Sequence, residues 1–282
     1  MITYSELRRE LVGMFADAGI ASAAVDSDLL ITELAGISRP ELFLCAGEPV
    51  PAELERHIRE LARRRANREP LQYLLGVAYF MDLELEVTPA VLIPRPETEL
   101  LAEYAVKHLP EGGSMLDLGT GSGAIALAVA AERPDVRITA VDVSSDALEV
   151  ARRNRVRCGG EVRFLQSDLF SELPGERFDL VGANLPYVTQ EEYPALEPEV
   201  RLFEPQLALT APDGGFRLIE RAARELADHL NPGGRAIFEL SPPQAPRLAE
   251  LFVKLGGFDE IDVLADYTRR DRFVSVRIAF RQ

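Results

Sequence analysis

The feature that most constrains the fold is a regular alternation of short apolar segments and helix-like segments from residue 114 onward. Such alternation is typical of a parallel sheet with helices on both faces, because parallel strands need long crossover connections and these are usually helical. The apolar runs indicate an α/β fold built on one sheet. We expect seven strands, at residues 115–117, 137–141, 162–165, 180–183, 235–240, 261–264 and 273–278.

The end of the chain departs from this alternation. Only a polar turn separates segments 261–264 and 273–278, and no helix-like pattern lies between them. Two strands joined in this way form a hairpin, so we expect the last strand to be antiparallel.

The first part of the chain has a different character. Residues 1–71 contain apolar residues at helical spacing and no strand pattern, which predicts a small all-α domain. Residues 83–87 alternate between apolar and acidic side chains, as a half-exposed strand does. We therefore expect residues 72–92 to form a β-hairpin that joins the helical domain to a second domain, residues 93–282.

Composition restricts the partners. The formal net charge is -15, whereas duplex nucleic acid and anionic membranes attract basic surfaces. The charge therefore disfavours nucleic acid and membrane partners, although it can also serve solubility alone. Neither the two cysteines nor the three scattered histidines have metal-ligand spacing, so no metal site is predicted. With no leader-like or membrane-spanning apolar run, we expect a cytoplasmic protein, and we take it to be a monomer.

A glycine-rich loop follows the first predicted parallel strand. It reads Asp-Leu-Gly-Thr-Gly-Ser-Gly over residues 117–123, and a predicted helix comes after it. Glycines let a backbone turn sharply and approach a ligand closely. Asp142 ends the next strand, where a carboxylate commonly binds a ribose diol. A tight turn without a ligand is the alternative, but the strand, loop, helix and acid together favour a nucleoside-containing cofactor.

The charge of the loop favours one cofactor over another. A dinucleotide would place its pyrophosphate against Asp117, which repels it. S-adenosylmethionine has no phosphate and carries a sulfonium and an ammonium group, so it suits carboxylates. Asp168 is expected near the adenine, although it fits a solvated turn equally well. The predicted cofactor contacts are Asp117, Gly119, Thr120, Gly121, Ser122, Gly123, Asp142, Val143, Asp168, Leu169 and Asn184.

A second motif, Asn-Leu-Pro-Tyr at residues 184–187, follows the fourth predicted strand. This strand should end beside the first strand, at the crevice where α/β sheets bind ligands. The tetrapeptide indicates a planar amide or amine nitrogen as the methyl acceptor. An amide nitrogen is a poor nucleophile, so two acceptors must hold its N–H bonds and direct its lone pair at the methyl group. The side-chain oxygen of Asn184 and a backbone carbonyl can do this, and Tyr187 can stack on the planar group. The predicted catalytic residues are Asn184, Pro186 and Tyr187, and the predicted substrate contacts are Asn184, Leu185, Pro186 and Tyr187.

These motifs resemble the HemK/PrmC family, which methylates a glutamine of peptide chain release factors. The segment Val-Leu-Ile-Pro-Arg-Pro-Glu-Thr-Glu at residues 91–99 is similar to the family's linker and is more specific than the two motifs above. The resemblance implies a class I (Rossmann-like) methyltransferase fold with a helical N-terminal domain that docks the partner. It also implies class 1 release factors as partners and the glutamine of their Gly-Gly-Gln motif as methyl acceptor.

The chain departs from the family pattern at two places. Leu185 stands where the family has the first proline of Asn-Pro-Pro-Tyr. Leucine offers the same backbone carbonyl but lacks the ring that fixes φ, so we expect similar geometry with a modest loss of rate at most. The segment 239–244 lacks the glycine expected after the corresponding strand. Arg95 and Glu97 fit either ordinary helix capping or a place near the cofactor.

Two other functions stay open from the sequence. An adenine N6 methyltransferase would use the same tetrapeptide on DNA or RNA, although the net charge of -15 and the absence of a basic recognition domain disfavour it. A module that binds S-adenosylmethionine without catalysis would require neither Asn184 nor Tyr187.

Overall fold

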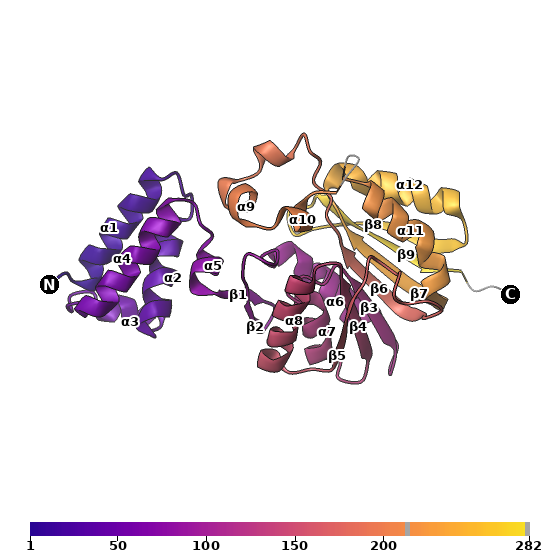
Figure 1. The fold of residues 1–282 in the computed structure, drawn as a ribbon, viewed down its shortest axis with the longest axis horizontal. Helices are drawn as coiled ribbons and strands as arrows, with labels where there is room; N and C mark the ends of the chain where they lie inside the picture. The colour runs from indigo at the N-terminus through magenta and orange to yellow at the C-terminus, as the bar shows by residue number, and fades with distance from the viewer. Residues whose placement is uncertain (212–214, 280–282) are drawn as a thin grey trace. The chain divides into compact units, whose positions relative to one another are not determined.

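The computed structural model describes residues 1–211 and 215–279 and divides the chain into two compact units (Figure 1). We call Met1–Gly76 together with Glu197–Phe203 the helical unit, and Val77–Leu196 together with Glu204–Gln282 the sheet unit. Residues 212–214 and 280–282 belong to the predicted domain 93–282 but lie outside the described residues. No helix in the described part of the chain is long and apolar enough to cross a bilayer.

The helical unit packs short helices around an apolar core that includes Leu7, Leu11, Phe15 and Ile58. Helical spacing of these side chains buries them on one side of each helix, as the sequence pattern predicts. The helices are α1 (Tyr4–Asp17), α2 (Ala23–Ala35), α3 (Arg39–Leu44), α4 (Ala52–Ala66), α5 (Leu71–Leu75) and α9 (Pro198–Phe203).

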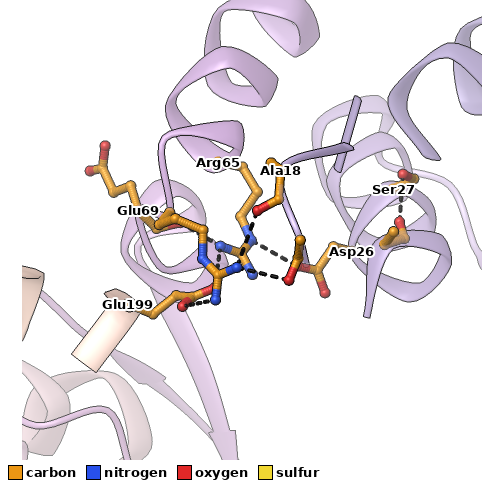
Figure 2. Close-up of polar contacts among 9 residues, drawn as sticks. Ala18, Asp26, Ser27, Arg65, Glu69 and Glu199 are labelled. Atoms are coloured by element: carbon orange, nitrogen blue, oxygen red, sulfur yellow. Dashed lines mark hydrogen bonds and ion pairs between the residues drawn. The ribbon is translucent and has the colours of Figure 1, made fainter. Parts of the chain in front are cut away.

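An ion-pair cluster attaches α9 to the rest of the helical unit. Arg65 donates from Nε to Asp26 Oδ2 at 2.7 Å and from Nη1 to Glu199 Oε1 at 2.9 Å, as Figure 2 shows. Arg68 Nη2 donates to Glu199 Oε2 at 2.5 Å. Burial favours the neutral form of Glu199, but the hydrogen bonds from Arg68 and Arg65 outweigh it and lower its pKa. A segment far away in the sequence is therefore tied to α4 by charge.

The sheet unit contains one seven-stranded sheet in the order β5-β4-β3-β6-β7-β9-β8. Only β9 is antiparallel to its neighbours β7 and β8, which confirms the predicted antiparallel last strand. The strand order reverses direction between β3 and β6, which are parallel neighbours. The strands are β3 (Ser114–Leu118), β4 (Arg137–Asp142), β5 (Val162–Gln166), β6 (Phe178–Asn184), β7 (Leu230–Glu239), β8 (Phe258–Ala265) and β9 (Asp271–Ile278).

Helices cover both faces of the sheet (Figure 1) and give it two apolar cores. Met115 of β3 faces the core shared with α6 and α7, whereas Leu116 and Leu118 face the core shared with α11 and α12. This division follows from the alternation of side chains along a strand. The helices are η1 (Pro96–Thr98), α6 (Glu99–His108), α7 (Ala124–Glu132), α8 (Ser145–Cys158), η2 (Tyr193–Ala195), α10 (Gln206–Leu209), α11 (Arg217–His229), η3 (Pro242–Gln244) and α12 (Ala245–Leu255).

A two-stranded hairpin precedes the main sheet. Strands β1 (Val77–Phe80) and β2 (Leu83–Glu86) pair antiparallel. The hairpin is shorter than the predicted range 72–92, because residues up to Leu75 complete α5 and Gly76 ends that helix with a left-handed φ of 72°.

Candidate active site

A cavity of about 320 Å³ lies at the carboxyl ends of β3, β4 and β6, and we call it the switch-point cavity. Its size is within the range of small-molecule sites, and its place is where open α/β sheets bind ligands. The loops after all three strands contribute to its wall. The predicted site residues that line it are Gly119, Gly121, Asp142, Val143, Asp168, Leu169, Asn184, Leu185 and Pro186.

The glycine loop brings the backbone close to the Asn-Leu-Pro-Tyr corner. Gly119 has a φ of 73°, a conformation that costs a side-chain-bearing residue energy. A Cβ atom at this position would lie 3.1 Å from Leu185 Cδ2 and 3.4 Å from the backbone oxygen of Asn184. Glycine at position 119 therefore leaves a narrow space between the loop and the corner, and the side chain of an alanine would begin to fill it.

Asp142 fixes the loop from the end of β4. Its Oδ2 accepts a hydrogen bond from the backbone N–H of Gly121 at 2.9 Å, and its Oδ1 accepts one from Ser144 at 2.9 Å. Burial raises the pKa of Asp142 above its usual value, and these backbone hydrogen bonds oppose the rise. Each carboxylate oxygen can accept more than one hydrogen bond, so Asp142 keeps capacity for ligand hydroxyls.

Asp117 is buried under the loop and does not line the cavity, although it is one of the predicted cofactor contacts. Its Oδ2 accepts from the Thr120 hydroxyl at 2.7 Å, and its Oδ1 has no hydrogen bond of normal geometry among the described residues. Burial raises the pKa of Asp117 to about 7, while the Thr120 hydrogen bond lowers it and Asp142 adds repulsion. Two acids behind one loop suit a cationic ligand and disfavour a pyrophosphate.

Three other predicted loop residues shape the loop without lining the cavity. Thr120 holds Asp117, and its backbone oxygen accepts from Gly123 at 2.8 Å. The backbone oxygen of Ser122 accepts from Asn154 Nδ2 at 2.9 Å.

Asp168 lines the cavity, but its side chain is 57% exposed and pairs with Arg221. The structure therefore fits both a place near the adenine and a solvated turn for this acid.

Asn184 is the last residue of β6, and its side-chain amide is hydrogen-bonded to a neighbour. Its Nδ2 donates to Thr98 Oγ1 at 3.2 Å, which leaves Oδ1 to accept hydrogen bonds from a ligand. Thr98 belongs to η1, within the segment 91–99 that the sequence marks as specific. Arg95 of that segment does not line the cavity and instead donates to Glu204 Oε1 at 2.6 Å.

Tyr187 does not line the cavity, although the sequence predicted it as a stacking residue. Its backbone oxygen accepts from Gln244 Nε2 at 3.0 Å, and its hydroxyl accepts from Arg272 Nη1 at 3.4 Å. Burial raises the pKa of the Tyr187 hydroxyl, with a further contribution from the charge of Glu239. These contacts hold the ring beside the corner.

Sequence reasoning missed part of the cavity wall. Residues 90–92 of the linker contribute to it, and so do Pro205, Leu207 and residues 208–211 in part. The second segment returns to the corner because the backbone N–H of Val188 donates to Leu209 O at 3.0 Å. The linker motif was a usable signal, whereas segment 205–211 has no pattern that marks it. The remaining unpredicted lining residues are Val141, Ser144, Ala147, Ser167 and Leu218.

Comparison with known proteins identifies the family. Residues 6–76 match the PrmC N-terminal domain, and residues 96–235 match the Methyltransferase small domain. A release factor glutamine methyltransferase from Geobacter sulfurreducens is 38% identical over 269 residues, which cover 94% of this chain and 93% of the relative. The chain belongs to the release factor glutamine methyltransferase family. Another member, from Chlorobaculum tepidum, is 37% identical over 284 residues, which cover 96% of this chain and 95% of the relative.

A solved structure has the same fold as the sheet unit of this chain. The crystal structure of a methyltransferase from Pyrococcus furiosus has a TM-score of 0.54 and 22% identity and covers 71% of this chain and 91% of its own. This likeness confirms the predicted class I methyltransferase fold. The family relationship confirms the predicted resemblance, and the chain is an S-adenosylmethionine-dependent methyltransferase.

Proposed function

We propose that the enzyme transfers a methyl group from S-adenosylmethionine to the side-chain amide nitrogen (N5) of the Gly-Gly-Gln glutamine in class 1 peptide chain release factors. The activity named for the relatives supports this acceptor. The observation that carries the proposal is the orientation of Asn184. Because its Nδ2 is engaged by Thr98, its Oδ1 is the atom left to accept an N–H bond of a planar amide in the switch-point cavity.

The proposed catalytic step depends on holding the acceptor nitrogen. Asn184 Oδ1 and the backbone carbonyl of Leu185 accept its two N–H bonds, which directs the lone pair toward the methyl group. Pro186 stiffens the corner, and we assign to Tyr187 stacking on the planar group where the acceptor side chain enters, outside the cavity wall. Positioning at about 3–3.5 Å supplies much of the rate acceleration, and the extra proton leaves after transfer without a general base.

The proposed cofactor site occupies the rest of the cavity. S-adenosylmethionine supplies an electrophilic methyl group on a positively charged sulfur. The backbones of Gly119 and Gly121 lie against the cofactor, Asp142 accepts from the ribose hydroxyls, and Asp168 lies toward the adenine. The other members of the proposed set are Asp117, Thr120, Ser122, Gly123, Val143, Leu169 and Asn184.

We assign the remaining features of the proposal by resemblance and charge. The helical unit docks the release factor, in keeping with the match of residues 6–76 to the PrmC N-terminal domain. The enzyme acts in the cytoplasm as a monomer and does not bind nucleic acid directly. The net charge of -15 supports the last point, because phosphate binding needs a basic surface.

One assay separates this function from the two alternatives. Radiolabelled S-adenosylmethionine is supplied with a release factor, with the same factor carrying a replaced Gly-Gly-Gln glutamine, and with duplex DNA. We expect label only in the unaltered release factor. Label in DNA alone would favour the adenine methyltransferase, and label in none of the three would favour a module that only binds the cofactor.

Asp142→Ala is expected to weaken S-adenosylmethionine binding at least ten-fold. The substitution removes the proposed ribose acceptor and the hydrogen bond that Gly121 donates to Oδ2, and a hydrogen bond to a charged group contributes about 1.5–3 kcal/mol. Titration calorimetry gives the Kd directly. Asp146→Ala, an exposed acid four residues later, removes the same charge and should leave the Kd within two-fold. Equal losses in both variants would show a general charge effect and contradict the assignment.

Leu185→Pro is expected to change kcat by less than about ten-fold. The position is proposed to act through its backbone carbonyl, which leucine and proline both possess. Proline loses the packing of the leucine side chain, which is only 4% exposed, and gains a fixed φ. Steady-state methylation of a release factor measures the change. A rise of about a hundred-fold, roughly 2.7 kcal/mol off the barrier, would contradict a backbone role for this position.

A further inference from the structure

A single hydroxyl connects Asn184 to a buried acid. Asn184 and Glu239 are neighbours in register at the carboxyl ends of β6 and β7. Thr98 is 5% exposed, and its Oγ1 accepts from Asn184 Nδ2 at 3.2 Å. The Thr98 side chain also lies within reach of the Glu239 carboxyl group, whose pKa it lowers through a hydrogen-bonding interaction. The network therefore runs from the proposed acceptor-binding amide to an acid that the proposed mechanism does not use.

Glu239 is held in unusual surroundings for a carboxyl group. It is 3% exposed, and its Oε2 has no hydrogen-bond partner among the described residues. A buried carboxyl oxygen without a hydrogen-bond partner costs free energy, so its presence in a folded protein points to a functional role or to a bound group that hydrogen-bonds to it. Its place next to Asn184 suggests that this role concerns the acceptor site.

The direction of the hydrogen bonds follows from counting protons. A threonine hydroxyl carries one hydrogen and can accept two hydrogen bonds. Because Thr98 accepts from Asn184, its own hydrogen is free to point to another acceptor, and the Glu239 carboxylate provides one. An ionised carboxylate can only accept, so it fixes the hydroxyl hydrogen, and the hydroxyl in turn fixes the Asn184 amide.

We infer that Thr98 and Glu239 are positioning residues that keep Oδ1 of Asn184 directed at the acceptor nitrogen. The inference rests on the proposed function, since it concerns how the same site orients its amide acceptor. With the amide rotated, Nδ2 would face the N–H bonds of the substrate, and two donors would oppose each other. The network excludes that orientation while Glu239 is charged.

The network makes the enzyme sensitive to pH. Burial raises the pKa of Glu239 to about 7, the Thr98 hydrogen bond and Arg272 lower it, Glu97 raises it, and Arg95 lowers it. Tyr187 also lies within electrostatic reach of Glu239. A protonated Glu239 can donate to Thr98, whose hydrogen then suits Asn184 Oδ1 and favours the rotated amide. Methyl transfer needs the charged form, so the rate should fall as the pH drops through about 7.

Two measurements on the full-length enzyme test the network. The first follows the side-chain NH₂ resonance of ¹⁵N-labelled Asn184, assigned by its loss in Asn184→Ala, as the pH is varied without any substrate. The second measures kcat and the KM for S-adenosylmethionine with a release factor. The variants are Thr98→Val, which has the same shape without the hydroxyl, Thr98→Ser, which restores the hydroxyl, and Glu239→Gln, which cannot ionise.

We expect the Asn184 resonance to titrate near pH 7 in the unaltered enzyme and to lose this titration in Thr98→Val and Glu239→Gln. Thr98→Val should lower kcat about ten-fold with little change in KM for the cofactor, and Thr98→Ser should recover most of the loss. An Asn184 resonance that does not titrate, or a serine variant as slow as the valine variant, would overturn the inference. Titration in an enzyme that leaves release factors unlabelled would support the network and contradict the proposed function.

Discussion

Asn184→Ala is expected to lower kcat for methyl transfer about a thousand-fold, equivalent to roughly 4 kcal/mol, while the Kd for S-adenosylmethionine changes less than ten-fold. The side chain provides the oxygen proposed to hold one N–H bond of the acceptor, and alanine leaves that bond without its acceptor. Most proposed cofactor contacts come from the loops after β3, β4 and β5, so they survive the substitution. The loss should therefore appear in the chemical step.

The comparison needs both a binding measurement and a matched asparagine. Titration calorimetry gives the cofactor Kd, and single-turnover transfer of a radiolabelled methyl group gives the rate. Asn231→Ala removes an asparagine that binds Asp179 Oδ1 near the start of β6, away from the cavity, and should keep the normal rate. An Asn184→Ala enzyme that transfers methyl groups at more than a tenth of the normal rate would contradict the assigned role.

Arg65→Ala is expected to reduce the free energy of unfolding of the helical unit by about 3–5 kcal/mol. The Arg65 side chain is 6% exposed and lies between Asp26 and Glu199, whose side chains are 9% and 14% exposed (Figure 2). Removing the cation leaves Asp26 without its partner and leaves Glu199 with Arg68 alone. A largely buried carboxylate that loses its partner costs far more than a surface ion pair contributes. The loss should also weaken the attachment of α9 to α4.

Hydrogen exchange of the α2 and α4 amides measures this loss within the helical unit. Arg56→Ala is the matched control, because Arg56 pairs with Glu53 at the surface of the same helix with a side chain 71% exposed, and it should cost less than about 1 kcal/mol. Equal protection of these amides in the two variants would contradict the predicted loss.

The ion pairs of Glu199 also make the stability of the helical unit depend on pH. Because the pKa of Glu199 is lowered in the folded unit, the charged form adds stability at pH values above the ordinary glutamate pKa, about 4.3. This contribution is lost as the pH falls through the lower pKa of the folded state.

Much of the fold could be predicted from the sequence, because the pattern within a single strand or helix indicates that element. The buried run at 137–141 becomes β4, and the polar turn before the last strand leads to the antiparallel β9. Side-chain alternation and connection length determine these features locally. The short helices of residues 193–209 were not predicted, because they are brief or adjoin prolines, and their conformation depends on tertiary contacts.

The candidate site also contains residues that could be predicted from the sequence and residues that could not. Asp142 and Asn184 were predicted because each ends a strand of the parallel sheet, and their places in the cavity agree with that reasoning. The burial of Asp117 could not be predicted, since nothing in the loop sequence says which face of β3 its carboxyl group takes. The partnership of Thr98 with Asn184 joins residues 86 positions apart, and only the packed fold brings them together.

The most direct test of the central claim is to locate the methyl group on its acceptor. Purified enzyme, S-adenosylmethionine and a class 1 release factor are incubated together, and the peptides of the factor are sequenced by tandem mass spectrometry. The proposed function predicts one added methyl group on the side-chain amide of the Gly-Gly-Gln glutamine, and far less of it when the Asn184→Ala variant is used in place of the unaltered enzyme. A methyl group on another residue, or a glutamine that stays unmodified, would contradict it.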